Sequence, residues 1–261
     1  MKASGRYNLM ELMVCVAARQ LEDGKTAVIG TGMPLAAAML AQKTTAPNLI
    51  IMFEAGSVAP LLEKLPHSVA DSFTMTNALM HSSMNEIMEA CQRGIVEYTF
   101  LGGAQIDMYG NLNSTIVGSN YQKPTVRLPG SGGANDLASL CWKTLIITPH
   151  DKRRFVPEVD FITSPGYLTG PGAREKAGLP PGAGPYKVIS TLALMGYDPE
   201  TKRMRLESIH PGASKEDVIA NTGFVLLEVD DIQTTPEPTL EELQILRNEV
   251  DPEGLIIGKT G

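Results

Sequence analysis

The chain has 261 residues, of which 43% are hydrophobic and 20% are charged, as in a globular protein with a substantial core. Lys and Arg number 22 and Asp and Glu 29, and the resulting net charge of −7 argues against nucleic acid or an anionic membrane as the main partner. No apolar run approaches the roughly 20 residues of a membrane-spanning helix, so we expect no membrane partner.

The three cysteines, Cys15, Cys91 and Cys141, lie far apart and form no CxxC pair. An odd and sparse set of cysteines is typical of proteins in a reducing compartment. We therefore expect a cytoplasmic protein without a disulfide framework or a zinc module.

Helices and strands alternate in the first half of the sequence. Asn8 can cap a first helix, because Glu11 stands in the capping-box position three residues later. A strand over 26–29, a helix over 35–42 and a strand over 48–53 are expected next. The last of these, NLIIMF, is continuously apolar, which is typical of a strand buried on both faces in a parallel sheet covered by helices.

The second half is richer in strands. A helix over 85–93 and a strand over 95–101 are followed by expected strands over 143–148, 160–163, 186–191 and 203–209. Ser214 can cap a helix over 215–221, and Thr239 one over 239–250 that ends before Pro252. We predict one domain over 1–261, of α/β class, with an open, mainly parallel sheet flanked by helices and a strand-rich second half.

Gly and Pro occupy half of the positions over 164–185, which argues against helix or central strand there. A segment of this kind is either a surface crossing or a loop of an active site or subunit contact. Both readings remain open.

The turn Gly30-Thr31-Gly32 between a strand and a helix is a weak dinucleotide-binding signal. The third small residue of that fingerprint is replaced by Leu35, and Pro34 alters the turn. The glycines still allow a ligand to approach the backbone closely, and N–H groups at a helix start attract negative charge.

Glu54 directly follows the expected strand 48–53 and precedes Ala55-Gly56. Ligands of parallel α/β sheets bind at the carboxyl ends of strands. Glu54 is therefore a candidate catalytic residue, with a solvated or ribose-binding carboxylate as the alternative.

Two further segments are rich in polar residues and glycine. Residues 101–115 have the sequence LGGAQIDMYGNLNST. Residues 130–136 have the sequence GSGGAND, which predicts a flexible loop that is either a connection or an oxyanion hole or anion cradle. The cations Lys152, Arg153 and Arg154 either contact phosphates or form a solvated turn. The four histidines show no metal-ligand spacing, so we expect no metal site.

Several motifs in order resemble the B (β) subunit of family I coenzyme A transferases, in the glutaconate CoA-transferase branch. The matching pieces are VIGTGMPL (28–35), FEAG (53–56), the two polar segments above, HDKRRF (150–155), ITSPG (162–166), GPGAREKAGLP (170–180) and NTGF (221–224). The family has Glu-Ser-Gly where this chain has Glu54-Ala55-Gly56, which bears on acceptor specificity. The resemblance implies a fold of the NagB/RpiA type.

The resemblance also implies a ping-pong transfer of CoA from an acyl-CoA to a carboxylic acid, with Glu54 as nucleophile. The CoA thioester is a substrate, and no bound cofactor is expected. A separate A (α) subunit is expected to complete a hetero-oligomer. We expect the oxyanion and CoA contacts at Gly30, Thr31, Gly32, Gly132, Gly133, Ala134 and Asn135, and we expect Gln105 and Asn113 to lie near the substrate. The alternative is an acyl-CoA hydrolase, or a carbon–carbon lyase or decarboxylase, on the same scaffold.

Overall fold

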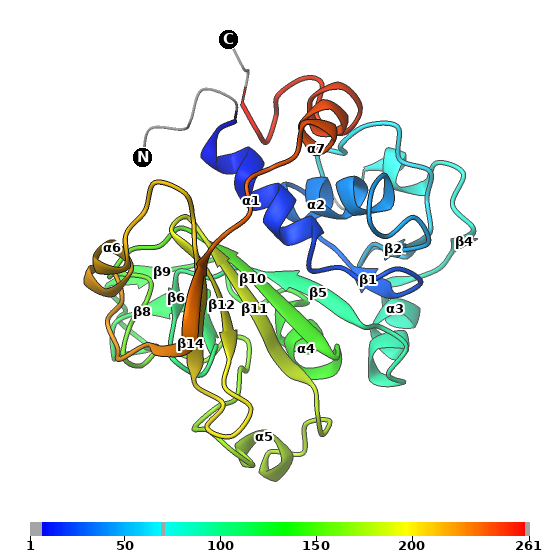
Figure 1. The fold of residues 1–261 in the computed structure, drawn as a ribbon. Coiled ribbons are helices and arrows are strands. Elements are labelled where there is room, and N and C mark those ends of the chain that lie inside the picture. The colour runs from blue at the N-terminus through cyan, green and yellow to red at the C-terminus, as the bar shows by residue number, and fades with distance from the viewer. Residues whose placement is uncertain (1–6, 69–70, 259–261) are drawn as a thin grey trace. The chain divides into compact units, whose positions relative to one another are not determined.

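The computed structural model describes residues 7–68 and 71–258 (Figure 1). The chain divides into two compact units. Unit 1 comprises residues up to 100 and from 236 onward, and unit 2 comprises 101–235. The single domain expected from the sequence stays a prediction.

The sheet of unit 1 has the strand order β5-β1-β2-β3-β4. Parallel pairing joins β1 (Thr26–Val28) to β2 (Ile50–Met52) and to β5 (Tyr98–Leu101). The short strands β3 (Ser57–Val58) and β4 (Met80–His81) continue it in antiparallel fashion. The helices of this unit are α1 (Leu9–Ala18), α2 (Met33–Gln42), the 3-10 turn η1 (Ser72–Met75), α3 (Met84–Gln92), α7 (Leu240–Ile245) and the π-helical turn η2 (Leu246–Val250).

Helices α1 and α2 pack against each other and are almost wholly buried. Neither has a polar stripe, and a helix that is apolar all round lies in a core rather than on a surface. The Asn8 side chain accepts from the Glu11 N–H at 3.0 Å, and Glu11 accepts in return from the Asn8 N–H at 2.8 Å. This reciprocal cap confirms the predicted start of the first helix.

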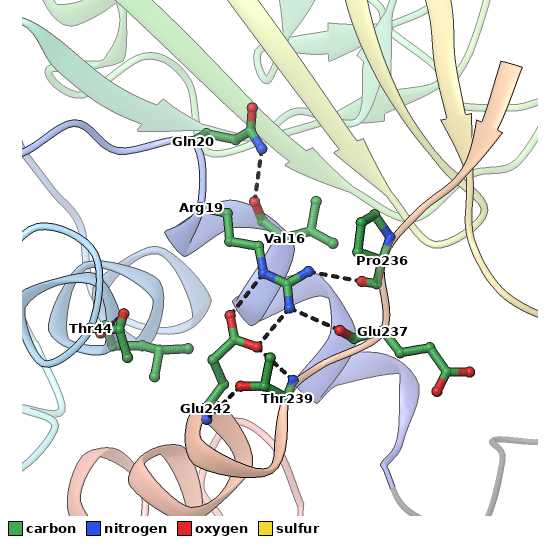
Figure 2. Close-up of polar contacts among 9 residues, drawn as sticks. Val16, Arg19, Gln20, Thr44, Pro236, Glu237, Thr239 and Glu242 are labelled. Atoms are coloured by element: carbon green, nitrogen blue, oxygen red, sulfur yellow. Dashed lines mark hydrogen bonds and ion pairs between the residues drawn. The ribbon is translucent and has the colours of Figure 1, made fainter. Parts of the chain in front are cut away.

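Arg19, at the end of α1, ties the returning C-terminal segment to the rest of unit 1 (Figure 2). Its guanidinium donates to both carboxylate oxygens of Glu242, at 2.8 and 2.6 Å, and to the carbonyls of Pro236 and Glu237, at 2.8 and 2.9 Å. Burial raises the pKa of Glu242, but the hydrogen bonds from Arg19 and the Thr239 backbone outweigh it and hold that pKa below its usual value. The pair therefore fixes the start of α7 on α1.

Glu242→Gln is expected to lower the free energy of unfolding by about 2 kcal/mol, because it leaves the half-buried Arg19 without its counter-charge. Urea unfolding at neutral pH measures the change. Glu241→Gln, at the exposed neighbouring position, is the matched control and should change stability by less than about 0.5 kcal/mol. Equal stabilities for the two variants would contradict the role given to the pair.

The sheet of unit 2 has the order β10-β11-β12-β13-β14. Strands β10 (Lys143–Thr148) and β11 (Gly184–Ser190) pair in parallel, as do β13 (Met204–Ile209) and β14 (Leu227–Thr234). Strand β12 (Ala193–Tyr197) is antiparallel to both neighbours. Two hairpins, β6 (Gln105–Ile106) with β7 (Leu112–Asn113) and β8 (Ile116–Val117) with β9 (Val126–Arg127), accompany helices α4 (Ala134–Leu140), α5 (Ala173–Lys176) and α6 (Lys215–Ala220).

The predicted α/β class with a mainly parallel sheet flanked by helices is confirmed, since parallel register pairs predominate and the strand-rich half is unit 2. The predicted caps at Ser214 and Thr239 are also confirmed, and both form capping boxes. The predicted strand over 160–163 is wrong. There, the Asp160 N–H donates to the Gln105 side chain and the Thr163 N–H to the Leu112 carbonyl, so this backbone bonds to the β6–β7 hairpin instead of joining the sheet.

The Gly- and Pro-rich segment 164–185 is not free of helix. It contains the single turn α5, and its last two residues begin β11. Arg174 of α5 is 2% exposed and donates to the carbonyls of Pro165, Gly166, Ala138 and Ser139. The hydrogen bonds of this buried guanidinium hold the segment in a fixed conformation, although its Gly and Pro residues do not favour regular secondary structure.

Candidate functional site

Unit 1 brings the glycine turn and Glu54 to the same edge of its sheet. Strands β1 and β2 are parallel neighbours with Val28 opposite Met52, so their carboxyl ends coincide. The Ile29 N–H donates to the Met52 carbonyl at 3.0 Å, directly before both loops begin. Gly30, Thr31 and Gly32 follow β1, and Glu54 follows β2, as the sequence predicts.

Glu54 stands in a tight turn and is half-buried. The turn is closed by the Phe53 N–H, which donates to the Ser57 carbonyl at 2.8 Å, and by the Gly56 N–H, which donates to the Phe53 carbonyl at 2.9 Å. Phe53 is wholly buried and anchors the turn. Among residues 7–68 and 71–258, no hydrogen bond or ion pair engages the Glu54 carboxylate. The backbone thus places a carboxylate that the described chain leaves available to a reacting group.

Gly56 gives this turn its shape. Its φ of +119° lies in a region that side chains rarely adopt, and a Cβ there would lie 2.1 Å from the Ser82 carbonyl oxygen. The Ser82 N–H donates to the Gly56 carbonyl at 2.9 Å. The segment leading to α3 therefore packs directly on the backbone beside Glu54.

Gly56→Ala is expected to lower the free energy of unfolding by about 2 to 3 kcal/mol, because backbone must move to relieve the clash with Ser82. Gly24→Ala is the matched control, since Gly24 also has a positive φ (+70°) but a Cβ there meets nothing within 4 Å. That variant should lose only about 1 kcal/mol. Chemical denaturation of both variants measures the difference, and equal losses would contradict the close packing.

The glycine turn leaves backbone donors exposed at the start of α2. Gly32 caps the helix with φ 83° and ψ −144° and has no side chain to accept from the first turn. Within the described part of the chain, no acceptor pairs with the N–H groups of Gly30, Thr31 or Gly32. A Cβ built on Gly30 would meet nothing within 4 Å. These donors at a helix start favour an anion or a developing oxyanion.

The second glycine segment, in unit 2, is more ordered than the predicted flexible loop over 130–136. Helix α4 begins at Ala134, with Gly133 as its cap. The Ala134 N–H donates to the Ser131 carbonyl at 3.0 Å and the Asn135 N–H to the Ser131 hydroxyl at 3.3 Å. Of the four residues predicted here, Gly132 and Gly133 keep N–H groups without an acceptor among the described residues, whereas those of Ala134 and Asn135 are engaged.

Gln105 and Asn113, also in unit 2, face each other across the β6–β7 hairpin. Asn113 Nδ2 donates to Gln105 Oε1 at 2.6 Å, and Gln105 Nε2 donates to Asp160 Oδ2 at 3.0 Å. Asn113 Oδ1 accepts from the N–H groups of Thr115 and Ile116. The hydrogen bonds of both side-chain amides thus stabilise the β6–β7 hairpin and its contact with Asp160. Their predicted place next to substrate stays a prediction.

Asp160 and Thr163 are residues that the sequence analysis missed. Asp160 also accepts from the Gly118 N–H at 2.8 Å, and the Thr163 hydroxyl accepts from the Ser114 N–H at 2.9 Å. The Thr163 carbonyl accepts from Asn135 Nδ2 at 2.9 Å. Within unit 2 they connect the polar hairpin to the start of α4. The only sequence signal was two polar side chains inside an expected strand.

The three cysteines are buried. Burial, together with the nearby Glu242, raises the pKa of the Cys15 thiol to about 12, which keeps it protonated and unreactive. In the described part of the chain, no group of three or more His, Cys, Asp or Glu side chains could hold a metal ion. None of the helices described there has the length and apolar character needed to cross a bilayer.

Comparison with known proteins agrees with the resemblance. The family model described as "Coenzyme A transferase" matches residues 11–221. The chain is 37% identical to the β (B) chain of glutaconate CoA-transferase from Acidaminococcus fermentans, over 94% of this chain and 93% of that protein. It is also 37% identical to the β (B) chain of 3-oxoadipate CoA-transferase from Pseudomonas knackmussii, over 92% of each.

Solved structures give the same result for the fold. The crystal structure of glutaconate coenzyme A-transferase from A. fermentans matches with a TM-score of 0.92 at 35% identity, covering 98% of this chain and 99% of that one. The decarboxylase AibA/AibB matches with a TM-score of 0.82 at 25% identity, covering 95% and 96%. The scaffold therefore serves more than one reaction.

Proposed function

The chain belongs to the coenzyme A transferase family, and we propose that it is a catalytic β subunit in which Glu54 carries CoA between two acids. The observation that supports this most is the place of Glu54. It is a half-buried carboxylate at the carboxyl end of β2, with no partner among the described residues, beside the N–H donors of the glycine turn. The two relatives named as transferase β chains, each 37% identical, favour transfer as the reaction.

The chemistry follows from a carboxylate nucleophile, which needs no general base. Glu54 attacks the thioester carbonyl of the donor, the carbon–sulfur bond breaks, and an acyl-glutamyl anhydride and CoA thiolate result. The thiolate attacks the glutamyl carbonyl, which releases the donor acid and leaves a glutamyl-CoA thioester. The acceptor carboxylate then repeats both steps in reverse and leaves with the CoA. No redox or metal group takes part.

Each attack passes through a tetrahedral oxyanion, which fixed N–H donors stabilise. In unit 1, the N–H groups of Gly30, Thr31 and Gly32 are the proposed donors. They need no reorganisation when the charge develops, because the turn is set by β1 and the start of α2. Binding energy from the distant parts of CoA can then be used to orient the thioester.

We also propose that an α subunit assembles with this chain. AibA/AibB, a solved relative, is named as a pair of chains. Several large apolar side chains of unit 1 are exposed within residues 61–84, a segment that also includes Ser82, which bonds to the Glu54 turn at Gly56. They are Leu61 (64%), Phe73 (47%), Leu79 (83%), Met80 (49%) and Met84 (51%). A contiguous exposed apolar patch is typical of an interaction surface, and we propose that these side chains contribute to one.

Leu79→Asp is expected to lower the amount of α subunit that co-purifies with the chain by at least about tenfold, since a charge would be buried at the contact. Ile95→Asp, at an apolar position 47% exposed outside that segment of unit 1, is the control and should retain assembly. Size-exclusion chromatography of the co-expressed subunits measures the yield. Full assembly of the Leu79→Asp variant would mean that the α subunit does not bind at Leu79.

The reaction itself is tested by dependence on an acceptor acid. The co-expressed complex is given a panel of short acyl-CoA thioesters with and without carboxylic acids, and acyl-CoA products are followed by liquid chromatography and mass spectrometry. Transfer predicts that a new acyl-CoA forms only when an acceptor is present. The likeness to the decarboxylase AibA/AibB supports the alternative. In that case the acyl group would lose CO₂, or CoA would be released, without any acceptor.

A further inference from the structure

The side chain of Ser57 connects the Glu54 turn to a neighbouring segment of unit 1. Ser57 begins β3 and is wholly buried. Its hydroxyl donates to the carbonyl of Thr74, which belongs to η1 and is itself buried. A buried hydroxyl lowers stability unless it is hydrogen-bonded, and an alanine would fill a small core position without that requirement. The bond to Thr74 therefore points to a role beyond packing.

Ser57 also takes part in the turn through its backbone. Its carbonyl accepts from the Phe53 N–H at 2.8 Å, and Phe53 directly precedes Glu54. The turn between Phe53 and Ser57 consists only of residues 54–56. The position of Ser57 thus determines where the backbone lies on both sides of Glu54.

The turn η1 gives the Ser57 hydroxyl an ordered acceptor. The Asp71 side chain caps η1 by accepting from the Phe73 N–H at 3.1 Å. The N–H and the hydroxyl of Thr74 both donate to the Asp71 carbonyl, at 2.9 and 2.7 Å. These bonds fix the direction of the Thr74 carbonyl. The hydrogen bond from Ser57 to that carbonyl therefore restrains the backbone three residues after Glu54.

We infer that Ser57 is a positioning residue for Glu54, and that its bond to Thr74 keeps the Glu54 carboxylate in the orientation needed for attack on the thioester. This inference rests on the proposed function, because it concerns the same nucleophile. Since Ser57 is wholly buried, it acts on the reaction only through the backbone of the turn. Catalysis is sensitive to such displacements, because a shift of about 1 Å can cost about 100-fold in rate.

Ser57→Ala removes the bond to Thr74 without adding volume to the core. The assembled complex is mixed with a saturating amount of the acyl-CoA it consumes, without acceptor, and is quenched with hydroxylamine after increasing times. Mass spectrometry gives the rate constant and the final extent of hydroxamate formation on Glu54. We expect the rate constant to fall about tenfold at an unchanged final extent. In steady-state transfer, kcat should fall about tenfold while the KM for acyl-CoA stays the same.

Two further variants separate positioning from stability. Thr44→Val is the matched control, because it removes only a hydroxyl of unit 1 that donates to the Leu40 carbonyl at 2.7 Å, just after the end of α2. It should keep the rate constant within about twofold. Ser57→Cys keeps a weaker donor of similar size and should lose about threefold in rate constant. It also provides the test if the Ser57→Ala chain does not assemble.

A Ser57→Ala complex that modifies Glu54 at the full rate would overturn the inference while leaving CoA transfer intact. A lower final extent at an unchanged rate constant would also overturn it, because Ser57 would then affect only the amount of folded complex. If the complex with the unchanged chain consumes acyl-CoA without any hydroxamate on Glu54, the proposed function fails, and the inference fails with it.

Discussion

Replacing Glu54 by Gln is expected to lower the rate of CoA transfer by at least about 10³-fold, with little change in stability. The amide is nearly the same size as the carboxylate but cannot form the anhydride, so both covalent steps lose their nucleophile. The fold should tolerate the change because the carboxylate has no partner among the described residues. Steady-state transfer between an acyl-CoA and an acceptor acid measures the effect, with urea unfolding as the stability check.

Glu89→Gln is the matched control for this result. Glu89 is an exposed glutamate of α3 in the same unit, and its replacement should leave transfer within about twofold of the unchanged chain. A Glu54→Gln complex with full transfer activity would mean that Glu54 is not the nucleophile.

Acidification from pH 7 to pH 5 is expected to cost unit 2 several kcal/mol of stability through two buried histidines. His150 bonds to the Ser190 and Thr222 hydroxyls at 2.8 and 3.0 Å, and His210 bonds to the Thr235 hydroxyl and the Ser190 carbonyl at 2.9 Å each. Burial lowers the pKa of each histidine to about 4 from an ordinary value of 6.5. For His150, the nearby Asp151 opposes this shift and His210 adds to it.

The direction of the change in stability with pH follows from the protons that the folded and unfolded chains bind. Between pH 6.5 and pH 4 the unfolded chain binds protons on these histidines that the folded chain does not, so stability is full above pH 6.5 and falls as the pH falls toward 4. At pH 5 the loss is about 2 kcal/mol for each histidine. Asp107 acts in the other direction, because burial raises its pKa from 3.8 to about 6. Its protonation restores about 1 kcal/mol over the same range.

Urea unfolding at pH 7 and pH 5 measures this balance. His150→Gln should lose less stability on acidification than the unchanged chain, by about 2 kcal/mol, and Asp107→Asn should lose more, by about 1 kcal/mol. His81→Gln, at an exposed position of β4, is the control and should follow the unchanged chain. A His150→Gln chain with the full acid sensitivity would contradict the buried neutral state of this histidine.

The sequence predicts well where structure is decided locally. The helix caps of Asn8, Ser214 and Thr239 depend on residues at most three positions apart, and all three caps form as expected. The apolar run ending at Phe53 becomes the buried strand β2, and that strand places Glu54 at the sheet edge. These features rest on short-range periodicity, which a sequence shows directly.

Structure that depends on distant partners could not be predicted in this way. Residues 160–163 have the composition of a strand, but Asp160 bonds to Gln105, 55 positions away. Strand β14 was not predicted, because its charged and exposed residues, such as Glu228, Asp230 and Asp231, lack the apolar run expected of a strand. Helix α5 is held by Arg174, whose four carbonyl acceptors come from two other segments. Partners in other segments decide the first and the last of these cases, and the exposed charges of β14 decide the second.

The most direct test of the account is mass spectrometry of the Glu54 peptide. The complex is incubated with the acyl-CoA it consumes, without acceptor, and then quenched with hydroxylamine, which converts a glutamyl thioester to a hydroxamate. The account predicts a hydroxamate mass shift on Glu54 and on no other glutamate of the chain. If the acyl-CoA is consumed while Glu54 stays unmodified at every time point, the account is contradicted. The complex would then catalyse a reaction without a glutamyl intermediate.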